Sequence, residues 1–286
     1  MDEASPEATP PVRNILVLAQ WDGTDFCGWQ QQAGARTVQR ELTAAVERMV
    51  HHPVTLFASS RTDSGVHSEG MPVNFETTRA IPADNFINGL NTFLPTDLSV
   101  VEARELPFGW RSREMAVAKT YTYRVQLGPR RALTDRFAWA VKRDRLDLDA
   151  MREAATHLLG EHDFAAFRSA QCDAHTTRRH LHSLDVLGPD ASGLISLVVT
   201  GNAFLRNMVR ILAGTLVEVG LLRHPPSWVR DVRDGLDRTR SGMTAPSRGL
   251  TLTKVHFEGY PRLGKRALAP PAPVDGESPS EARPSS

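Results

Sequence analysis

The stretch Val54-Thr55-Leu56-Phe57-Ala58-Ser59-Ser60-Arg61-Thr62-Asp63-Ser64-Gly65-Val66-His67 is predicted to join two strands through a tight turn. Val54 to Ala58 is a β-favouring apolar run, and Met71, Val73 and Phe75 beyond the turn alternate with polar residues. Asp-Ser-Gly is a common turn sequence, because Asp and Ser bond their own backbone and Gly accepts positive φ. Two strands in direct succession place a hairpin-like pair between the flanking helices.

The segments on either side complete a recognisable order. Upstream, Ile15 to Ala19 reads as a buried strand, and Thr37 precedes a helix with Val38, Leu42, Val46 and Met49 at helical spacing. Downstream, Pro82 opens a helix that carries Phe86, Leu90 and Phe93 on one face, and Leu98 to Ala103 is a further strand. The order β-α-β-β-α-β is that of the ferredoxin-like split unit.

The second part of the chain repeats this order with insertions. Strands are predicted over 117–127, 181–187, 194–200 and 250–257, and helices over 148–159, from Phe204 to about Leu221, and over 228–236. In the last strand Leu250 and Leu252 are out of phase with Val255 and Phe257, which indicates a β-bulge near Lys254.

Four regions follow from this pattern. We predict disordered tails at 1–12 and 264–286, which are rich in Pro, Ser and charge, and two ferredoxin-like domains at 13–110 and 111–263. The fold class is α+β: two tandem βαββαβ halves form one continuous, mostly antiparallel sheet with helices on one side. A central cleft between the halves is the expected binding site, since ligands favour domain interfaces.

Composition narrows the class of protein. The chain has 286 residues, 41% of them hydrophobic, and a formal net charge of +1. That charge argues against indiscriminate coating of nucleic acid but allows a basic groove. No apolar run is long enough to cross a membrane, and the N-terminus lacks a signal pattern, so a cytoplasmic protein is expected. Cys27 and Cys172 are expected to be free thiols.

Spacing alone allows two interpretations for several side chains. Lys119, Tyr121 and Tyr123 share one face of a strand, where tyrosines either pack in the sheet or stack on a base. Arg206 and Arg210 share a helix face, where an arginine either extends to solvent along the apolar stripe or holds a carboxylate ionised. A further group of basic residues forms either a phosphate-binding surface or a solvated charged face, and their spacing favours neither interpretation. They are Arg111, Arg113, Lys119, Arg124, Arg130, Arg131, Arg136, Arg168, Arg178 and Arg179.

Other chemistries fit the sequence less well. An aspartic-type hydrolase needs two carboxylates that share a proton, and no second Asp-Thr/Ser-Gly occurs. The histidines between His175 and His182 lack matching ligands at metal-site spacing, so no metal site is expected. Neither a phosphate-cradling glycine motif nor a Rossmann fingerprint is present.

Taken together, the motifs resemble one family. Arg61 to His67 is similar to the Arg-Thr-Asp-Ala-Gly-Val-His motif of the tRNA pseudouridine synthase A (TruA) family, with Ser64 in place of Ala. Further segments resemble that family in order between about Arg13 and Tyr260: Trp21-Asp22-Gly23, Gly28-Trp29-Gln30, Lys119 to Tyr123, Leu159 to Phe164, Asn202-Ala203-Phe204, Met208-Val209-Arg210 and Gly249-Leu250.

The resemblance implies a function and roles for five residues. The family converts uridine to pseudouridine at positions 38 to 40 of the tRNA anticodon stem-loop, as a homodimer, without cofactor or metal. By resemblance Asp63 is the nucleophile and Arg210 pairs with it. Tyr121 stacks on the target base, Leu250 lines the pocket, and Arg61 helps to displace the uridine. The alternative is a non-catalytic RNA-binding or tRNA chaperone module of the same fold.

Overall fold

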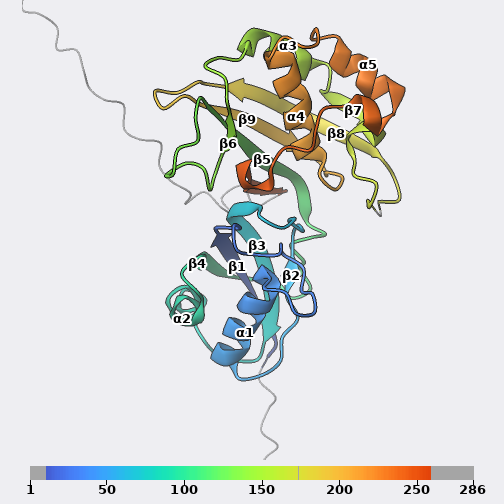
Figure 1. Cartoon of the computed structure of the whole chain (residues 1–286). Helices are drawn as coiled ribbons and strands as arrows, with labels where there is room; N and C mark the ends of the chain where they lie inside the picture. The colour runs from blue at the N-terminus through green and yellow to red at the C-terminus, as the bar shows by residue number, and fades with distance from the viewer. Residues whose placement is uncertain (1–10, 173, 259–286) are drawn as a thin grey trace, which may run out of the picture.

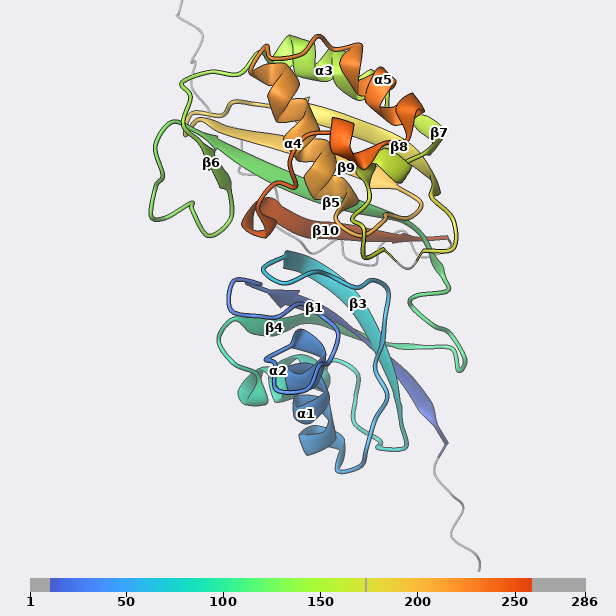
Figure 2. The same cartoon turned by 45° about the vertical axis from the view of Figure 1, so that its right-hand side comes forward.

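The computed structural model describes residues 11–172 and 174–258, and within them ten strands form one sheet in the order β4-β1-β3-β10-β5-β9-β8-β7, with β2 on β3 and β6 on β5. The helices of both halves cover the same side of this sheet (Figures 1 and 2). The strands are β1 (Arg13–Trp21), β2 (Phe57–Ala58), β3 (His67–Thr77), β4 (Leu98–Leu106), β5 (Ala116–Leu127), β6 (Trp139–Val141), β7 (Gly160–Asp163), β8 (Arg178–Leu187), β9 (Leu194–Gly201) and β10 (Leu250–Phe257). The helices are α1 (Val38–Val50), α2 (Asn85–Phe93), α3 (Leu148–Thr156), α4 (Met208–Gly220) and α5 (Trp228–Gly235).

Each half has the strand order expected for a ferredoxin-like unit. In the N-terminal half the order is β4-β1-β3-β2, and in the C-terminal half it is β10-β5-β9-β8. Thr37 caps the N-terminus of helix α1, since its side chain accepts a hydrogen bond from the Arg40 N–H, and the helix buries Val38, Leu42 and Val46. The predicted fold class is therefore confirmed, while the division of the chain at 110/111 stays a prediction.

The two halves join through a short parallel contact between β3 and β10. His67 and Ser68 at the start of β3 lie opposite Thr251 and Leu252 of β10. The turn that contains Asp63 immediately precedes β3, so this junction places it beside the C-terminal half. The bulge expected near Lys254 is confirmed, because the register of β10 against β5 shifts between Leu252 and Lys254.

Some element bounds differ from expectation for local reasons. The strand expected over 54–58 shortens to Phe57–Ala58, because the Val54 N–H donates to the Glu47 carboxylate and not to a strand. Helix α4 begins at Met208 and not at Phe204, because Asn207 has a left-handed φ of 62°. Strands β6 and β7 were not expected. The tail at 264–286 and most of the tail at 1–12 lie outside the described residues. Among the described residues, no helix has the length and apolarity to span a membrane.

Candidate active site

Asp63 lies in a tight turn between β2 and β3. The Val66 N–H donates to the Asp63 carbonyl at 3.2 Å, and Gly65 takes a φ of 76°, a left-handed conformation that favours glycine. The Asp63 side chain is 34% exposed, so its carboxylate is accessible. The local sequence thus forms the turn that Asp-Ser-Gly predicts, and it presents one carboxylate to solvent.

A loop from the end of β1 holds this turn in place. The Trp29 N–H donates to the Thr62 carbonyl at 3.1 Å, and the Gly65 N–H donates to the Phe26 carbonyl at 3.2 Å. Gly28 has a φ of 86°, and a Cβ atom there would lie 2.6 Å from the Thr62 carbonyl oxygen. The Gly-Trp-Gln segment is therefore the close-packed support of the Asp63 turn.

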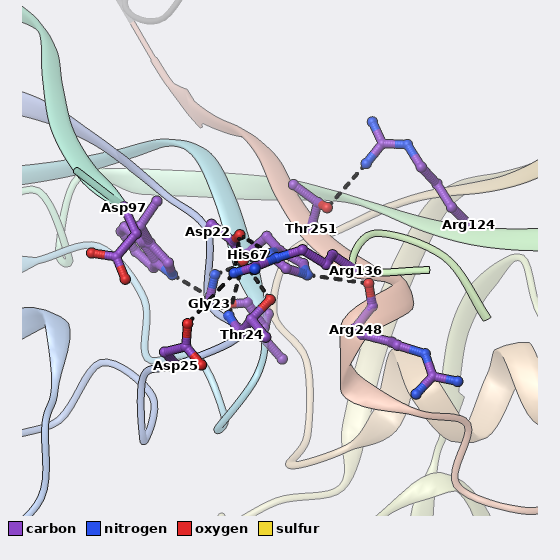
Figure 3. Close-up of polar contacts among 12 residues, drawn as sticks. Asp22, Gly23, Thr24, Asp25, His67, Asp97, Arg124, Arg136, Arg248 and Thr251 are labelled. Carbon is purple, nitrogen blue, oxygen red and sulfur yellow. Dashed lines mark hydrogen bonds and ion pairs between the residues drawn. The ribbon is translucent and has the colours of Figure 1, made fainter. Parts of the chain in front are cut away.

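His67, four residues after Asp63, connects this support to the C-terminal half (Figure 3). The Gly23 N–H donates to its Nδ1 at 2.9 Å, so the remaining hydrogen lies on Nε2, which is 3.2 Å from the Arg248 carbonyl oxygen. Burial lowers the pKa of His67, against the charge of Asp22. Asp22 in turn pairs with Arg136 at 2.9 Å. A neutral imidazole thus joins the two halves beside the catalytic candidate.

Tyr121 lies on β5 and faces the Asp63 turn across the cleft. Its hydroxyl is 3.1 Å from the Ser60 Oγ, and its ring packs edge-on against Phe204, with ring centres 5.2 Å apart. Burial raises the pKa of Tyr121 to about 12, and the charge of Asp63 adds to that rise. The phenol therefore keeps its proton at neutral pH.

The two candidate arginines take different positions. The Arg206 Nε is 3.9 Å from the Asp63 Oδ1, and this is the ion pair that the described structure contains for Asp63. Arg210 donates instead to the Ala245 carbonyl oxygen at 2.7 Å and to the Asn207 Oδ1 at 2.8 Å. Burial lowers the pKa of Arg210, and the charge of Asp63 opposes that effect. The direct pairing expected for Arg210 is thus formed by Arg206, while Arg210 acts on Asp63 at longer range.

All five predicted site residues line one cleft of about 970 Å³ between the halves: Arg61, Asp63, Tyr121, Arg210 and Leu250. Leu250, the first residue of β10, is buried and lies opposite Tyr123 of β5. Arg61 is exposed at the turn. The structure therefore brings together residues that are up to 189 positions apart in the sequence (250 − 61).

Sequence reasoning assigned no site role to two neighbours of these residues, Ser60 and Phe204, and it left the role of Arg206 open. Ser60 and Phe204 fix Tyr121 from two sides, and Arg206 contacts Asp63. The four-residue spacing of Arg206 and Arg210 predicts a shared helix face, but Arg206 precedes α4. The spacing therefore could not show that Arg206 pairs with Asp63. Within residues 11–172 and 174–258, no three His, Cys, Asp or Glu side chains gather closely enough to hold a metal ion.

Comparisons with known proteins agree with the motifs. The family model described as tRNA pseudouridine synthase matches residues 17–113 and 154–258. A protein of Geobacter sp. (strain M21) named tRNA pseudouridine synthase A is 44% identical over 250 residues, which are 86% of this chain and 99% of that protein. One from Myxococcus xanthus with the same name is 41% identical over 267 residues, 92% of this chain and 97% of that protein. The resemblance seen in the sequence is confirmed, and the chain belongs to the tRNA pseudouridine synthase family of isomerases.

Proposed function

We propose that this chain isomerises uridine to pseudouridine at positions 38 to 40 of the tRNA anticodon stem-loop, with Asp63 as the nucleophile and without a cofactor. The observation that carries the proposal is the shared cleft, in which Asp63 from one half lies with Tyr121, Arg210 and Leu250 from the other. We also propose that the enzyme works in the cytoplasm as a homodimer.

The reaction suits a single accessible carboxylate. Isomerisation breaks the glycosidic bond, turns the base and forms a carbon–carbon bond, with no net change of redox state. A carboxylate that attacks either the ribose or the uracil ring splits this change into two easier steps. The Asp63 side chain is about one third exposed on a turn that is hydrogen-bonded to the loop around Gly28, and a nucleophile held in place needs little reorganisation at the moment of attack.

The remaining residues take supporting roles. The Tyr121 ring, fixed by Ser60 and Phe204, offers a flat surface on which the displaced uracil stacks, and its protonated phenol can donate a hydrogen bond. Leu250 adds apolar contact at the same wall. In this proposal Arg61, which is exposed two residues before Asp63, enters the RNA helix as the uridine leaves it, since a paired base must leave the stack before its carbons can be reached.

The test is a comparison of Asp63→Asn with Asp149→Asn, which changes a carboxylate that is 93% exposed on α3, far from the cleft residues in the sequence. Tritium release from C5-tritiated tRNA and mapping of pseudouridine are the measurements. Asp63→Asn should bind tRNA and form no product, and Asp149→Asn should match the unchanged enzyme. Product from folded Asp63→Asn protein would refute the role of Asp63. Binding of tRNA by the unchanged protein without any tritium release would favour the non-catalytic module, and product at other tRNA positions would refute the assigned site.

A further inference from the structure

His67 is a buried imidazole for which the proposed reaction has no direct use. Its side chain is only 3% exposed, and it is not among the described residues that line the cleft, so it does not face the substrate site. Both ring nitrogens are nevertheless engaged, one toward each half of the chain (Figure 3). The ring of Phe137 packs against the imidazole, with ring centres 4.9 Å apart. The side chain is therefore held in one orientation between the halves.

The N-terminal side of this contact is secured several times over. Gly23, which donates to the His67 Nδ1 at 2.9 Å, lies so close to the Val66 backbone that a Cβ atom would not fit between them. The Phe26 N–H donates to the Gly23 carbonyl at 3.0 Å, and the Phe26 carbonyl accepts from the Gly65 N–H at 3.2 Å. The loop after β1 would therefore stay on the Asp63 turn without the bond to the imidazole.

The C-terminal side depends on a single hydrogen bond. The His67 Nε2 is 3.2 Å from the carbonyl oxygen of Arg248, and among the described residues no other hydrogen bond joins residues 246–249 to the N-terminal half. Arg248 belongs to the single-turn 3-10 helix Ser247–Gly249, which leads directly into Leu250 at the cleft. The same turn of helix abuts the Asp63 turn, because a Cβ atom on Gly65 would collide with the Ser247 Oγ. The imidazole thus holds the backbone that carries Leu250 against the turn that carries Asp63.

We propose that His67 is a positioning residue, whose bond to the Arg248 carbonyl sets the place of Leu250 relative to Asp63. The inference rests on the proposed function, since it takes Asp63 and Leu250 to face the target uridine. A small displacement of groups around the reacting atoms slows the chemical step, even where the rest of the binding surface is unchanged. Loss of the bond should therefore appear in kcat and not in KM.

Two substitutions separate the two bonds of the imidazole. Asn places an amide oxygen near the position of Nδ1, so it keeps the acceptor for Gly23 but is too short to reach Arg248. Gln places an amide nitrogen near the position of Nε2, so it keeps the donor for Arg248 and loses the acceptor for Gly23. His67→Asn should lower kcat for pseudouridine formation about tenfold and change KM for tRNA less than about twofold, whereas His67→Gln should recover most of kcat. His224→Asn, at an exposed position outside the cleft lining, is the control and should match the unchanged enzyme.

A second measurement tests whether His67 acts through Leu250. In a Leu250→Ala protein, adding His67→Asn should lower kcat by at most about twofold, because the side chain that His67 positions is already absent. The inference is overturned by equal losses in the Asn and Gln proteins, by an effect on KM alone, or by the full tenfold loss in the Leu250→Ala protein. Failure of His67→Asn to fold, followed by circular dichroism, also overturns it, since His67 would then serve the fold alone. Product formation by the unchanged enzyme and by Asp63→Asn decides the proposed function separately, so the two failures are distinguishable.

Discussion

Replacing Lys119 by Met is expected to stabilise the RNA-free protein. The fall of the pKa of Lys119 from 10.5 to about 8 corresponds to about 3 kcal/mol of unfavourable charge burial, at roughly 1.4 kcal/mol for each pH unit. Met retains a long apolar stem and removes the charge, so packing along β5 should persist. We therefore expect the free energy of unfolding at pH 7 to rise by as much as about 3 kcal/mol.

The sign of the pH dependence follows from proton linkage. As pH rises, the folded protein releases the Lys119 proton near pH 8, whereas the unfolded chain keeps it until about 10.5. The stability of the unchanged protein therefore increases over this interval, and the variant lacks that increase. By pH 9.5 the advantage of the Met variant should shrink to about 1 kcal/mol.

Urea unfolding at pH 7 and pH 9.5 measures both quantities. Lys142→Met serves as the control, because Lys142 is exposed and outside the cleft lining, and it should change stability by less than about 0.5 kcal/mol. The reasoning would be refuted if the Lys119→Met protein were less stable than the unchanged protein at pH 7. It would also be refuted if the change in the free energy of unfolding were the same at both pH values.

Three further predictions concern the support of the site. Arg210→Ala removes the hydrogen bonds to Ala245 and Asn207, so it should lower the free energy of unfolding by about 2 kcal/mol and the activity at least tenfold. Arg210→Lys should recover part of both losses. Unchanged activity of the Arg210→Ala protein would exclude Arg210 from the site. The lowered pKa of His67 predicts that the free energy of unfolding, measured with urea, falls as the pH drops below 6.5. The His67→Asn protein, which keeps an acceptor for the Gly23 N–H, should show a smaller fall. An equal fall in both proteins would assign the effect to other groups. Gly28→Ala, whose Cβ would meet the Thr62 carbonyl at 2.6 Å, should lower kcat, whereas Gly34→Ala, also at positive φ but with open space, should not; equal kcat values would contradict the support role of Gly28.

Local chemistry in the chain predicts much of the fold. Apolar periodicity placed the main strands and helices, because burial on one face of a helix or strand leaves a repeat of 3.6 or 2 residues. The phase break in the last strand located the bulge between Leu252 and Lys254. The short strands β6 and β7 escaped prediction, because three or four residues are too few to establish a period.

The candidate site was predictable where a residue type carries its own chemistry. The sequence by itself determined the family, the exposed turn of Asp63, and the presence of Tyr121, Arg61, Arg210 and Leu250, because motifs record which residues are present. It could not determine which arginine reaches Asp63. Arg206 lies outside helix α4, which begins only after the left-handed Asn207, so the helical spacing between Arg206 and Arg210 does not apply.

Tertiary structure alone decided how distant side chains meet. The short β3–β10 junction joins the halves, and His67 connects Gly23 to Arg248 beside it. The same arrangement places Lys119, which is partly buried, in the lining of the cleft. Burial, pairing and charge at a cleft depend on three-dimensional distance, and residues far apart in the chain carry no local signal of it. For that reason the turn around Asp63 could be found in the sequence, and its surroundings only in the fold.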